Sequence, residues 1–565
     1  MNLSLGLSLK TLLISAIIAL LIALNLQSLF NESFFGMHDF THVARLAEMD
    51  RALRDGHFPV RWSKNFGYGY GMPLFNFYGP LPFYTAEIAY VLGFSAIASI
   101  KFMMIAIAAI GVVGTYVLST KWFGRSGGLL AASLFLFIPY RALDLFVRGA
   151  LNELFSISMI PWILYGLVQL HESKKISWKW IGLTSVAFFG LFTSHILMVM
   201  VFVPFLVLLA FLWGAAARSK LSFFLSFLLS FLLGIGLSAF YIVPAFFEKG
   251  FTQVDKLVGG YSAYYYHFLY VRQFFIGAWG YGGSILGLED GVSFSLGAVH
   301  VILAVLGGIA LVRSKLRWKW KILIPFGIIG ALSLFLTTFK SKILWDTLPL
   351  IEYIQFPWRY LSVPAVILPL VGGASVGIVK QGFKRTLFTI IAVIAVVLLN
   401  ISLFRPEKFL EDSSVLYYTD EQKIQTKLSE ILPDYIPKSM RELQASGKQV
   451  IEIEQGSLHQ DTENSNFEVL VDRTHELLFS MNVSSPVTIL VRKSWFPVWK
   501  VYDNGKEIEY QVDETSGFLR FSIGTGKHLI GVRLAESPVR VVSNVVSIIS
   551  LLALGVLLYG RSSRS

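Results

Sequence analysis

The stretch LSFFLSFLLSFLLGIGLSAFYIVPAF, residues Leu221–Phe246, contains no charged side chain. A helix needs about 20 predominantly apolar residues to cross the hydrocarbon core of a bilayer, so this segment is long enough to span a membrane. Similar stretches occur near both ends of the chain, at Thr11–Phe30 and Val541–Tyr559. None of them alternates apolar and polar residues as the strands of a membrane β-barrel do. The sequence therefore predicts an all-α membrane domain that crosses the bilayer several times.

The overall composition agrees with this class. Of the 565 residues, 55% are hydrophobic and 15% are charged, whereas a typical soluble domain has about 25% charged residues. The net charge of +12 comes from basic residues that cluster between the apolar stretches, so we assign it to membrane topology rather than to nucleic-acid binding. The chain has no cysteine, which excludes disulfides, zinc–thiolate sites and thiol nucleophiles.

Basic residues predict the topology, because cytoplasmic loops carry an excess of lysine and arginine. Lys10 places the N-terminus inside, and the first apolar stretch is predicted to be an uncleaved signal anchor because it has no small-residue cleavage site before Asn31. Alternation from there gives about twelve spans. Leu81–Leu92 is apolar, but its prolines and glutamate disfavour crossing, so we expect an interfacial helix. The clusters assigned to the cytoplasm are Lys121–Arg125, Lys174–Lys179, Arg218–Lys220, Arg313–Lys321, Lys380–Arg385 and Arg561–Arg564.

The composition changes abruptly near Arg405 and becomes apolar again after Pro538. Short, partly alternating segments rich in valine and isoleucine predict strands in between. These segments are Gln449–Glu454, Phe467–Val471, Val487–Val491 and Leu529–Leu534. Asp503-Asn504-Gly505 predicts a hairpin turn, because Asn-Gly tolerates the positive φ that such turns require.

The chain is thus predicted to have three parts. Residues 1–404 form a transmembrane domain with a first outer loop at 31–95, residues 405–538 form an extracytoplasmic β-sandwich domain, and residues 539–565 form a C-terminal transmembrane helix. We expect a multi-pass protein of the plasma membrane, with its chemistry on the outer face.

The first outer loop carries the strongest candidate for chemistry. Asp39 follows the first span by a few residues, where a carboxylate can meet both a water-soluble molecule and a membrane lipid. His42 lies three residues further on, and on a helix both side chains would share one face. The two could share a divalent metal such as Mg²⁺ or Mn²⁺, or orient one another. A hydrogen-bonded structural histidine is the alternative.

Other outer loops supply further polar candidates. They are Arg148, Asn152 and Glu153 after the predicted third span, His195 between the fifth and sixth, and Gln355 and Arg359 before the tenth. Charges so close to hydrocarbon are costly and need partners. Arg359 could clamp a phosphate, although snorkelling to the interface is the ordinary alternative. If these residues form a site, they should line one cavity, with the Asp39 and Glu153 carboxylates within about 10 Å of each other.

An aromatic loop, about Phe247–Asp290, lies on the same face and includes Tyr265 and Trp279. Such rings either stack on sugars or sit in the membrane interface.

Several of these motifs together carry a family resemblance. They are Asp39…His42…Arg45, Phe58-Pro59-Val60-Arg61-Trp62, Gly69-Tyr70-Gly71 with Pro73-Leu74-Phe75, Arg148-Gly149…Glu153, Gln355–Arg359, and Ser494–Lys500 with Asp503-Asn504-Gly505. They resemble the bacterial and archaeal membrane proteins labelled 6-pyruvoyl-tetrahydropterin-synthase-related, which are similar to YfhO-like proteins and to the GT-C glycosyltransferases. Nothing in the chain supports pterin chemistry.

The resemblance implies a GT-C-like fold, a catalytic first-loop aspartate, here Asp39, and a polyprenyl-phosphate sugar as donor. We predict inverting transfer to an extracytoplasmic glycan, lipid or protein, with Asp39 as general base. Arg148 and Arg359 would bind the donor phosphate, and Glu153 would share in catalysis, with His42 and His195 as candidate metal ligands or orienting groups. Contacts to the substrate are expected from Asn152, Gln355, Tyr265 and Trp279. The alternatives are a transporter or lipid-linked-glycan flippase, or a non-catalytic scaffold for envelope assembly.

Overall fold

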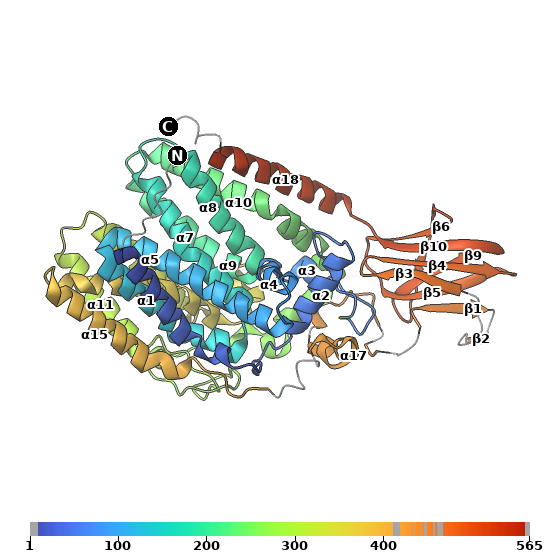
Figure 1. The fold of residues 1–565 in the computed structure, drawn as a ribbon, viewed down its shortest axis with the longest axis horizontal. Coiled ribbons are helices and arrows are strands. Elements are labelled where there is room, and N and C mark those ends of the chain that lie inside the picture. The colour runs from blue at the N-terminus through green and yellow to red at the C-terminus, as the bar shows by residue number, and fades with distance from the viewer. Residues whose placement is uncertain are drawn as a thin grey trace.

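The computed structural model describes residues 9–410, 418–431, 433–441, 443–445, 449–455, 458–459 and 467–559. A bundle of long helices forms one end of the elongated molecule, and two β-sheets form the other (Figure 1). The predicted fold class is confirmed: a helical membrane domain is followed by a separate β-domain and a last apolar helix.

A helix lies at the position of every predicted span. The long helices are α1 (Leu9–Asn25), α5 (Ala96–Phe137), α7 (Leu151–Glu172), α8 (Trp178–Ser194), α9 (Ile196–Ala215), α10 (Lys220–Glu248), α11 (Ala298–Arg313), α12 (Lys319–Leu336), α14 (Pro364–Gly373), α15 (Phe383–Asn400) and α18 (Pro538–Tyr559). By length and composition, eight helical segments of the described chain can cross a membrane. The total of about twelve crossings stays a prediction.

Helix α5 covers both the second and the third predicted spans. It runs over 42 residues, but Gly124 inside it has φ 73° and ψ 179°. This left-handed φ is costly for residues with a Cβ and is readily adopted by glycine. The kink divides α5 into two arms at the place where the sequence predicts a turn beside Arg125.

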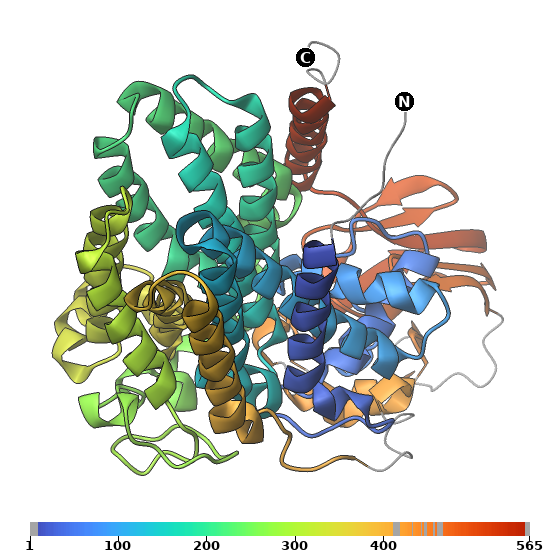
Figure 2. The same cartoon turned by 60° about the vertical axis from the view of Figure 1, so that its left-hand side comes forward.

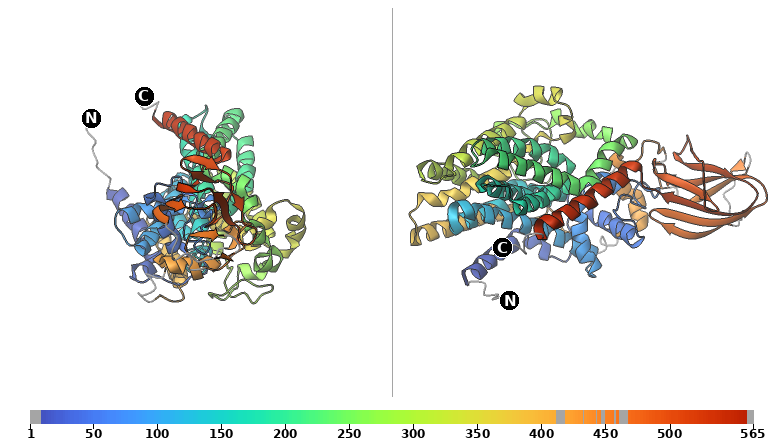
Figure 3. Two further views of the ribbon diagram at one scale, coloured as in Figure 1. Left: turned by 90° about the vertical axis from the view of Figure 1, so that its right-hand side faces the viewer. Right: turned by 90° about the horizontal axis from the view of Figure 1, so that it is seen from above.

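Short helices complete the described helical part of the chain. They are α2 (His42–Arg54), α3 (Leu74–Phe77), α4 (Leu81–Val91), α6 (Pro139–Ala142), α13 (Lys342–Thr347) and α17 (Glu421–Lys423). Helix α4 lies where an interfacial helix is predicted, and it packs against α2 and α5. The first outer loop is thus a folded unit, and it lies between the helical bundle and the β-sheets (Figures 1 and 3).

The β-domain consists of two antiparallel sheets, in the orders β2-β1-β5-β9-β8 and β3-β4-β10-β6-β7. The strands are β1 (Ile451–Gln455), β2 (Leu458–His459), β3 (Phe467–Arg473), β4 (Glu476–Val483), β5 (Val487–Ser494), β6 (Trp499–Asp503), β7 (Lys506–Ile508), β8 (Gln511–Val512), β9 (Phe518–Ile523) and β10 (Gly526–Leu534). Alternate residues of both sheets, such as Phe479 and Ile489, pack into one core. The predicted hairpin turn is confirmed between β6 and β7, with φ 50° at Asn504 and 82° at Gly505.

Two motifs of the sequence resemblance dock the β-domain onto the first outer loop. Trp62 leaves the loop and enters the core of the β-domain, where its ring lies 5.5 Å from Trp499 and 6.0 Å from Phe496 between centroids. The backbone N–H of Ser494 donates to the carbonyl of Tyr70 at 2.9 Å. The loop and the β-domain therefore share apolar core, which fixes their relative position.

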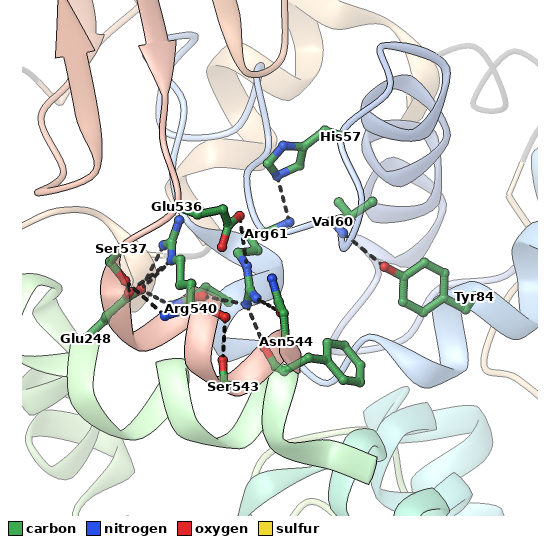
Figure 4. Close-up of polar contacts among 12 residues, drawn as sticks. His57, Val60, Arg61, Tyr84, Glu248, Glu536, Ser537, Arg540, Ser543 and Asn544 are labelled. Carbon is green, nitrogen blue, oxygen red and sulfur yellow. Dashed lines mark hydrogen bonds and ion pairs between the residues drawn. The ribbon is translucent and has the colours of Figure 1, made fainter. Parts of the chain in front are cut away.

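Three charged residues, Arg61, Glu248 and Arg540, form a second junction that we name the outer clamp (Figure 4). Glu248 ends α10 and accepts hydrogen bonds from Arg540 at 2.7 and 2.9 Å and from Asn76 at 2.9 Å. Arg61 donates to the carbonyl of Phe240 at 2.7 Å and to Asn544 at 2.9 Å. The clamp ties the first loop, α10 and α18 together.

Residues 418–431 and 433–441 do not join either sheet but pack against the first outer loop. The side-chain amide of Gln425 donates to Asn65 at 2.8 Å, and the ring of Tyr435 stacks on Phe77 at 6.2 Å between centroids. This segment therefore extends the wall of the membrane domain on the side of the β-domain. The loop between α10 and α11 lies at the same end of the bundle (Figure 2).

Candidate active site

A cavity of about 740 Å³, which we name the outer cavity after the predicted topology, opens where the first loop meets the ends of the helices on the side of the β-domain. The predicted site residues that line it are Asp39, Arg148, Asn152, Glu153, His195, Gln355 and Arg359. They come from segments up to 320 residues apart, since 359 − 39 = 320, so the predicted convergence is observed. The spacing of about 10 Å between the Asp39 and Glu153 carboxylates stays a prediction.

Backbone contacts bring Asp39 beside the Arg148 segment. The N–H groups of His38 and Asp39 donate to the carbonyls of Val147 and Arg148 at 2.8 and 2.9 Å. Gly149 follows with φ 68°, and a Cβ at this position would lie only 2.8 Å from the carbonyl oxygen of Asp39. A glycine is needed there because any larger residue would push the loop away from the helix end.

The Asp39 carboxylate is held at the cavity wall by three donors. Its Oδ2 accepts from Arg45 at 2.8 Å and from the Tyr78 hydroxyl at 3.1 Å, and its Oδ1 accepts from Thr41 at 3.0 Å. The side chain keeps 29% of its surface exposed. Burial alone would raise the pKa of Asp39, but the Arg45 guanidinium and these hydrogen bonds outweigh it and hold the pKa well below its usual range. Asp39 is therefore ionised at neutral pH.

His42 lies behind Asp39 and does not line the cavity. Its Nε2 is 2.6 Å from the carbonyl oxygen of Gly149, so this nitrogen carries the hydrogen and donates it. Its Nδ1 lies 3.4 Å from Arg45 Nη1, and burial lowers its pKa. A neutral His42 thus holds the loop and supports Arg45, which favours the orienting role over metal binding.

The hydrogen-bonded groups around Asp39 are not arranged to bind a metal ion through protein side chains. Both carboxylate oxygens already accept from protein donors, and both ring nitrogens of His42 are engaged. Within the described residues, no three His, Asp or Glu side chains lie where they could share an ion.

Glu153, in the first turn of α7, organises the cationic side of the cavity. Its Oε1 accepts from the Tyr140 hydroxyl at 2.5 Å, and its Oε2 lies 3.1 Å from Arg148 Nη1 and 3.5 Å from Arg359 Nε. Arg148 also pairs with Asp144 and lies 4.3 Å over the Trp358 ring. Two guanidinium groups therefore share one carboxylate at the cavity wall.

Asp144 is a second carboxyl group beside Arg148. Burial and the neighbouring Glu153 charge raise the pKa of Asp144 well above its ordinary value, and its Oδ2 has no hydrogen-bond partner within the described chain. A raised pKa favours the neutral form of a carboxyl group, so Asp144 compensates the Arg148 charge less well than Glu153 does.

Arg359 is fixed by its own segment. Its Nη1 donates to the carbonyl of Ile354 at 2.6 Å and to Gln355 Oε1 at 2.7 Å. Gln355 itself has φ 66°, an uncommon conformation for a residue other than glycine. Such backbone conformations cost energy and occur often at binding sites, so Gln355 is a positioning residue for Arg359.

Asn152 and His195 complete the predicted set at the cavity wall. Asn152 donates to the carbonyls of Gly79 and Ser194 at 2.9 and 2.8 Å, which holds the first loop against the end of α8. His195 lies in the α8–α9 turn, and its buried Nδ1 has no hydrogen-bond partner within the described chain. Burial and the Arg359 charge lower the pKa of His195 to about 3, so the ring is neutral.

The structure does not bring Tyr265 or Trp279 to the outer cavity. Tyr265 is 44% exposed and packs against Tyr266, with 4.5 Å between ring centroids. Trp279 packs against Tyr281 at 6.3 Å. Of the aromatic loop, Tyr261 is the tyrosine that lines the cavity within the described residues. Spacing in sequence could not show which of these rings line the cavity. Irregular turns, rather than a helix of known period, set the directions of their side chains.

Several cavity residues were not among the predicted site residues: Arg45, Tyr78, Lys249, Asp434 and Tyr435. Arg45 stands in a quoted motif, so a signal for it existed. Asp434 comes from a segment that the composition assigns to the β-domain, and no motif marks it. With Asp39 and Glu153 it is the third carboxyl group that lines the cavity, and burial raises its pKa to about 6.

Fold and site together define a class: a polytopic membrane protein with a charged cavity on the side of its β-domain. A family model described as a 6-pyruvoyl-tetrahydropterin synthase related domain, a membrane protein, matches residues 75–407. The chain belongs to this family, as its motifs predicted. Asp39 precedes the matched region, whereas Arg148, Glu153 and Arg359 lie inside it. No curated protein matches the chain.

Solved structures with a similar arrangement include two glycosyltransferases. The arabinofuranosyltransferase AftD from Mycobacteria matches with a TM-score of 0.47 and 15% identity over 71% of this chain and 27% of that one. ArnT from Cupriavidus metallidurans, bound to undecaprenyl phosphate, matches with a TM-score of 0.41 and 11% identity over 75% and 76%. The chain thus spans about a quarter of the length of AftD.

Proposed function

We propose that this protein is an inverting GT-C glycosyltransferase that transfers a sugar from a polyprenyl-phosphate donor to an acceptor hydroxyl on the outer face of the membrane. One observation carries the proposal: a single cavity joins an ionised, partly exposed carboxylate, Asp39, to two guanidinium groups, Arg148 and Arg359. Group transfer from a phosphate needs a group that receives the acceptor proton and a cation that stabilises the leaving oxygen.

The apolar part of the cavity suits the lipid portion of such a donor. Ile196 and Met200 of α9 and Ile242 and Phe246 of α10 line this part. Phe246 is 59% exposed, so the apolar wall continues to the surface of the bundle. A polyprenyl chain can lie there while its phosphate reaches the arginines.

The reaction would proceed in one displacement. The acceptor oxygen attacks the anomeric carbon, the bond from that carbon to the phosphate oxygen breaks, and the polyprenyl phosphate leaves as an anion between Arg148 and Arg359. The acceptor proton passes to Asp39. Because its pKa is held low, Asp39 is a weak base, so it orients the hydroxyl and takes the proton late in the attack. Asp434, with its pKa near 6, is the competing candidate for this role.

The proposal is tested with purified protein in liposomes and a panel of radiolabelled polyprenyl-phosphate sugars. Release of polyprenyl phosphate, together with label on an added glycan acceptor, is measured. Asp39→Asn should lower the rate roughly 10²–10⁴-fold, while Asp50→Asn should not change it. Asp50 is a matched control because it lies on α2, pairs with Arg54 at 2.8 Å and does not line the cavity.

The outcome separates the alternatives. A transporter or flippase, or a scaffold for envelope assembly, would leave the sugar–phosphate bond intact in every variant. Loss of activity in Asp434→Asn but not in Asp39→Asn would move the base to Asp434. Equal, normal turnover in both variants would refute Asp39 and Asp434 as the base.

A further inference from the structure

A second cavity, of about 730 Å³, lies at the opposite end of the bundle from the outer cavity. Helix α11 connects the two: Val292 and Phe294, just before it, line the outer cavity, and Ala310 and Leu311, near its end, line the second one. A helix of 16 residues is about 24 Å long. The second cavity therefore lies on the face that the positive-inside rule assigns to the cytoplasm.

The polar lining of this second cavity is cationic and rich in donors. It consists of Arg125, Lys315 and Arg385 with Ser126, Ser314, Gln381 and Thr386. No aspartate or glutamate of the described chain is among the residues that line it. Three cations around one hollow repel each other, and this repulsion is relieved when an anion binds between them. We name this hollow the basic cavity.

The chain holds the cations in place around the basic cavity. Arg125 follows the Gly124 kink of α5, which turns the chain there. Arg385, in the first turn of α15, donates through Nε and Nη2 to the carbonyl of Val379 at 3.1 and 2.8 Å. Its Nη1 donates to no group of the described chain, so this nitrogen remains for a ligand.

Topology alone explains why basic residues occur on this face, but not why three of them meet. Arg313, Arg317 and Lys384 are exposed on the same face, and none of them lines the basic cavity. Convergence on one hollow is therefore a separate feature, and Arg and Lys donors in such a group are suited to a phosphate.

Apolar side chains next to the basic cavity favour a lipid over free phosphate. Phe383 is 81% exposed, and Leu387 and Ile378 are 44% and 43% exposed. Helix α15 lies at the edge of the bundle (Figure 1), where such side chains meet acyl chains. We propose that the basic cavity binds the phosphate-bearing headgroup of an anionic phospholipid from the leaflet opposite the outer cavity. Pockets of basic residues between membrane helices bind such headgroups in other proteins.

The test uses the full chain in detergent and native mass spectrometry with added phosphatidylglycerol, phosphatidylcholine or inorganic phosphate. The variant R125Q/K315Q/R385Q removes the three cations, and R313Q/R317Q/K384Q removes the same charge from the same face. Each basic residue near a membrane surface adds to the binding free energy of an anionic lipid. Removing three of them should lower the affinity for that lipid roughly 100-fold. We expect the amount of phosphatidylglycerol bound to the first variant to fall by about this factor. The amount bound to the control variant should fall less than about threefold.

Three results would overturn the proposal: equal loss of lipid in both variants, equal retention of phosphatidylcholine by the wild type, or displacement of the lipid by inorganic phosphate at matched concentration. The first would mean a general surface charge effect, and the last a free phosphate site. Arg125 and Lys315 are exposed, so R125Q/K315Q should fold normally and show most of the loss even where the triple variant does not fold. The result is independent of any transferase activity.

Discussion

The outer cavity and the outer clamp are built from the same residue types but differ in what surrounds them. Both place largely buried arginines against a glutamate near the helix ends on the side of the β-domain: Arg148 and Arg359 with Glu153, and Arg540 with Glu248. The clamp glutamate receives further donors from Asn76 and Ser537, and neither Glu248 nor Arg540 lines the outer cavity. An ion pair enclosed by other elements connects segments, whereas one at a cavity wall can meet a ligand.

The same substitution in each region should separate these two roles. Arg540→Gln should lower the free energy of unfolding by roughly 3–5 kcal/mol, because it leaves the buried Glu248 charge without its cation. Thermal unfolding in detergent, followed by tryptophan fluorescence, measures this change. Lys506→Gln, in the exposed β6–β7 hairpin, should unfold like the wild type. A fall in melting temperature no larger than in that control would mean that the clamp does not stabilise the fold.

Arg148→Gln should show the opposite pattern. Glu153 keeps Arg359 and Tyr140 as partners, so we expect a smaller loss of stability, about 1–3 kcal/mol. Turnover should fall roughly 10²–10³-fold, the usual cost of removing a group that stabilises developing negative charge. The rate of polyprenyl-phosphate release and the melting temperature are measured on one preparation. If activity falls only in proportion to unfolded protein, Arg148 has a structural role like that of Arg540.

Acid should weaken both regions through buried histidines, His57 beside the clamp and His195 at the cavity, because the pKa of each is lowered to about 3. His57 accepts a hydrogen bond from the Arg61 N–H at 3.2 Å and stacks on His475 of the β-domain. Burial and His475 lower the pKa of His57 to about 3. The unfolded chain, with a histidine pKa near 6.5, therefore binds more protons between pH 6.5 and 3, and stability falls as the pH falls through this window.

We expect His57 to cost up to about 2 kcal/mol of stability between pH 6.5 and pH 5. The low pKa of Asp39 contributes nothing in this range, because that carboxylate loses its stabilising effect only when the pH falls below about 4, its pKa in the unfolded chain. His57→Gln keeps an acceptor for Arg61 but does not titrate, so its unfolding should depend less on pH. A profile identical to the wild type would assign the acid sensitivity elsewhere.

The smallest perturbation tests whether both regions face the outside. Cysteines replacing Ser262, in the outer cavity, and Ser484, in the β-domain, should react with an impermeant thiol reagent in intact cells. Cysteines replacing Ser173 and Ser314 should react only after lysis. The natural chain contains no cysteine, so it gives no background. Labelling of Ser484→Cys only after lysis would reverse the orientation of the protein.

Sequence and structure agree best on features that depend on neighbouring residues. The apolar stretches gave helices at the predicted positions, the Asn504-Gly505 turn gave a hairpin, and the motifs identified the family. Hydropathy, turn preference and charge at helix ends each act over a few residues. They also predicted that polar groups from separate outer loops, such as Asp39 and Glu153, would meet on one face.

What the sequence by itself determined was therefore the class of the protein, its helices and the outer set of charged residues. Only the tertiary structure decided which charges face a ligand. Arg61 and Arg148 both stand in quoted motifs, yet Arg61 joins the clamp and Arg148 lines the cavity. Asp434 reaches the cavity because residues 433–441 pack against the first loop. The reason is physical: a side chain's partners across hundreds of residues depend on how the helices and loops pack, and no local pattern records that packing.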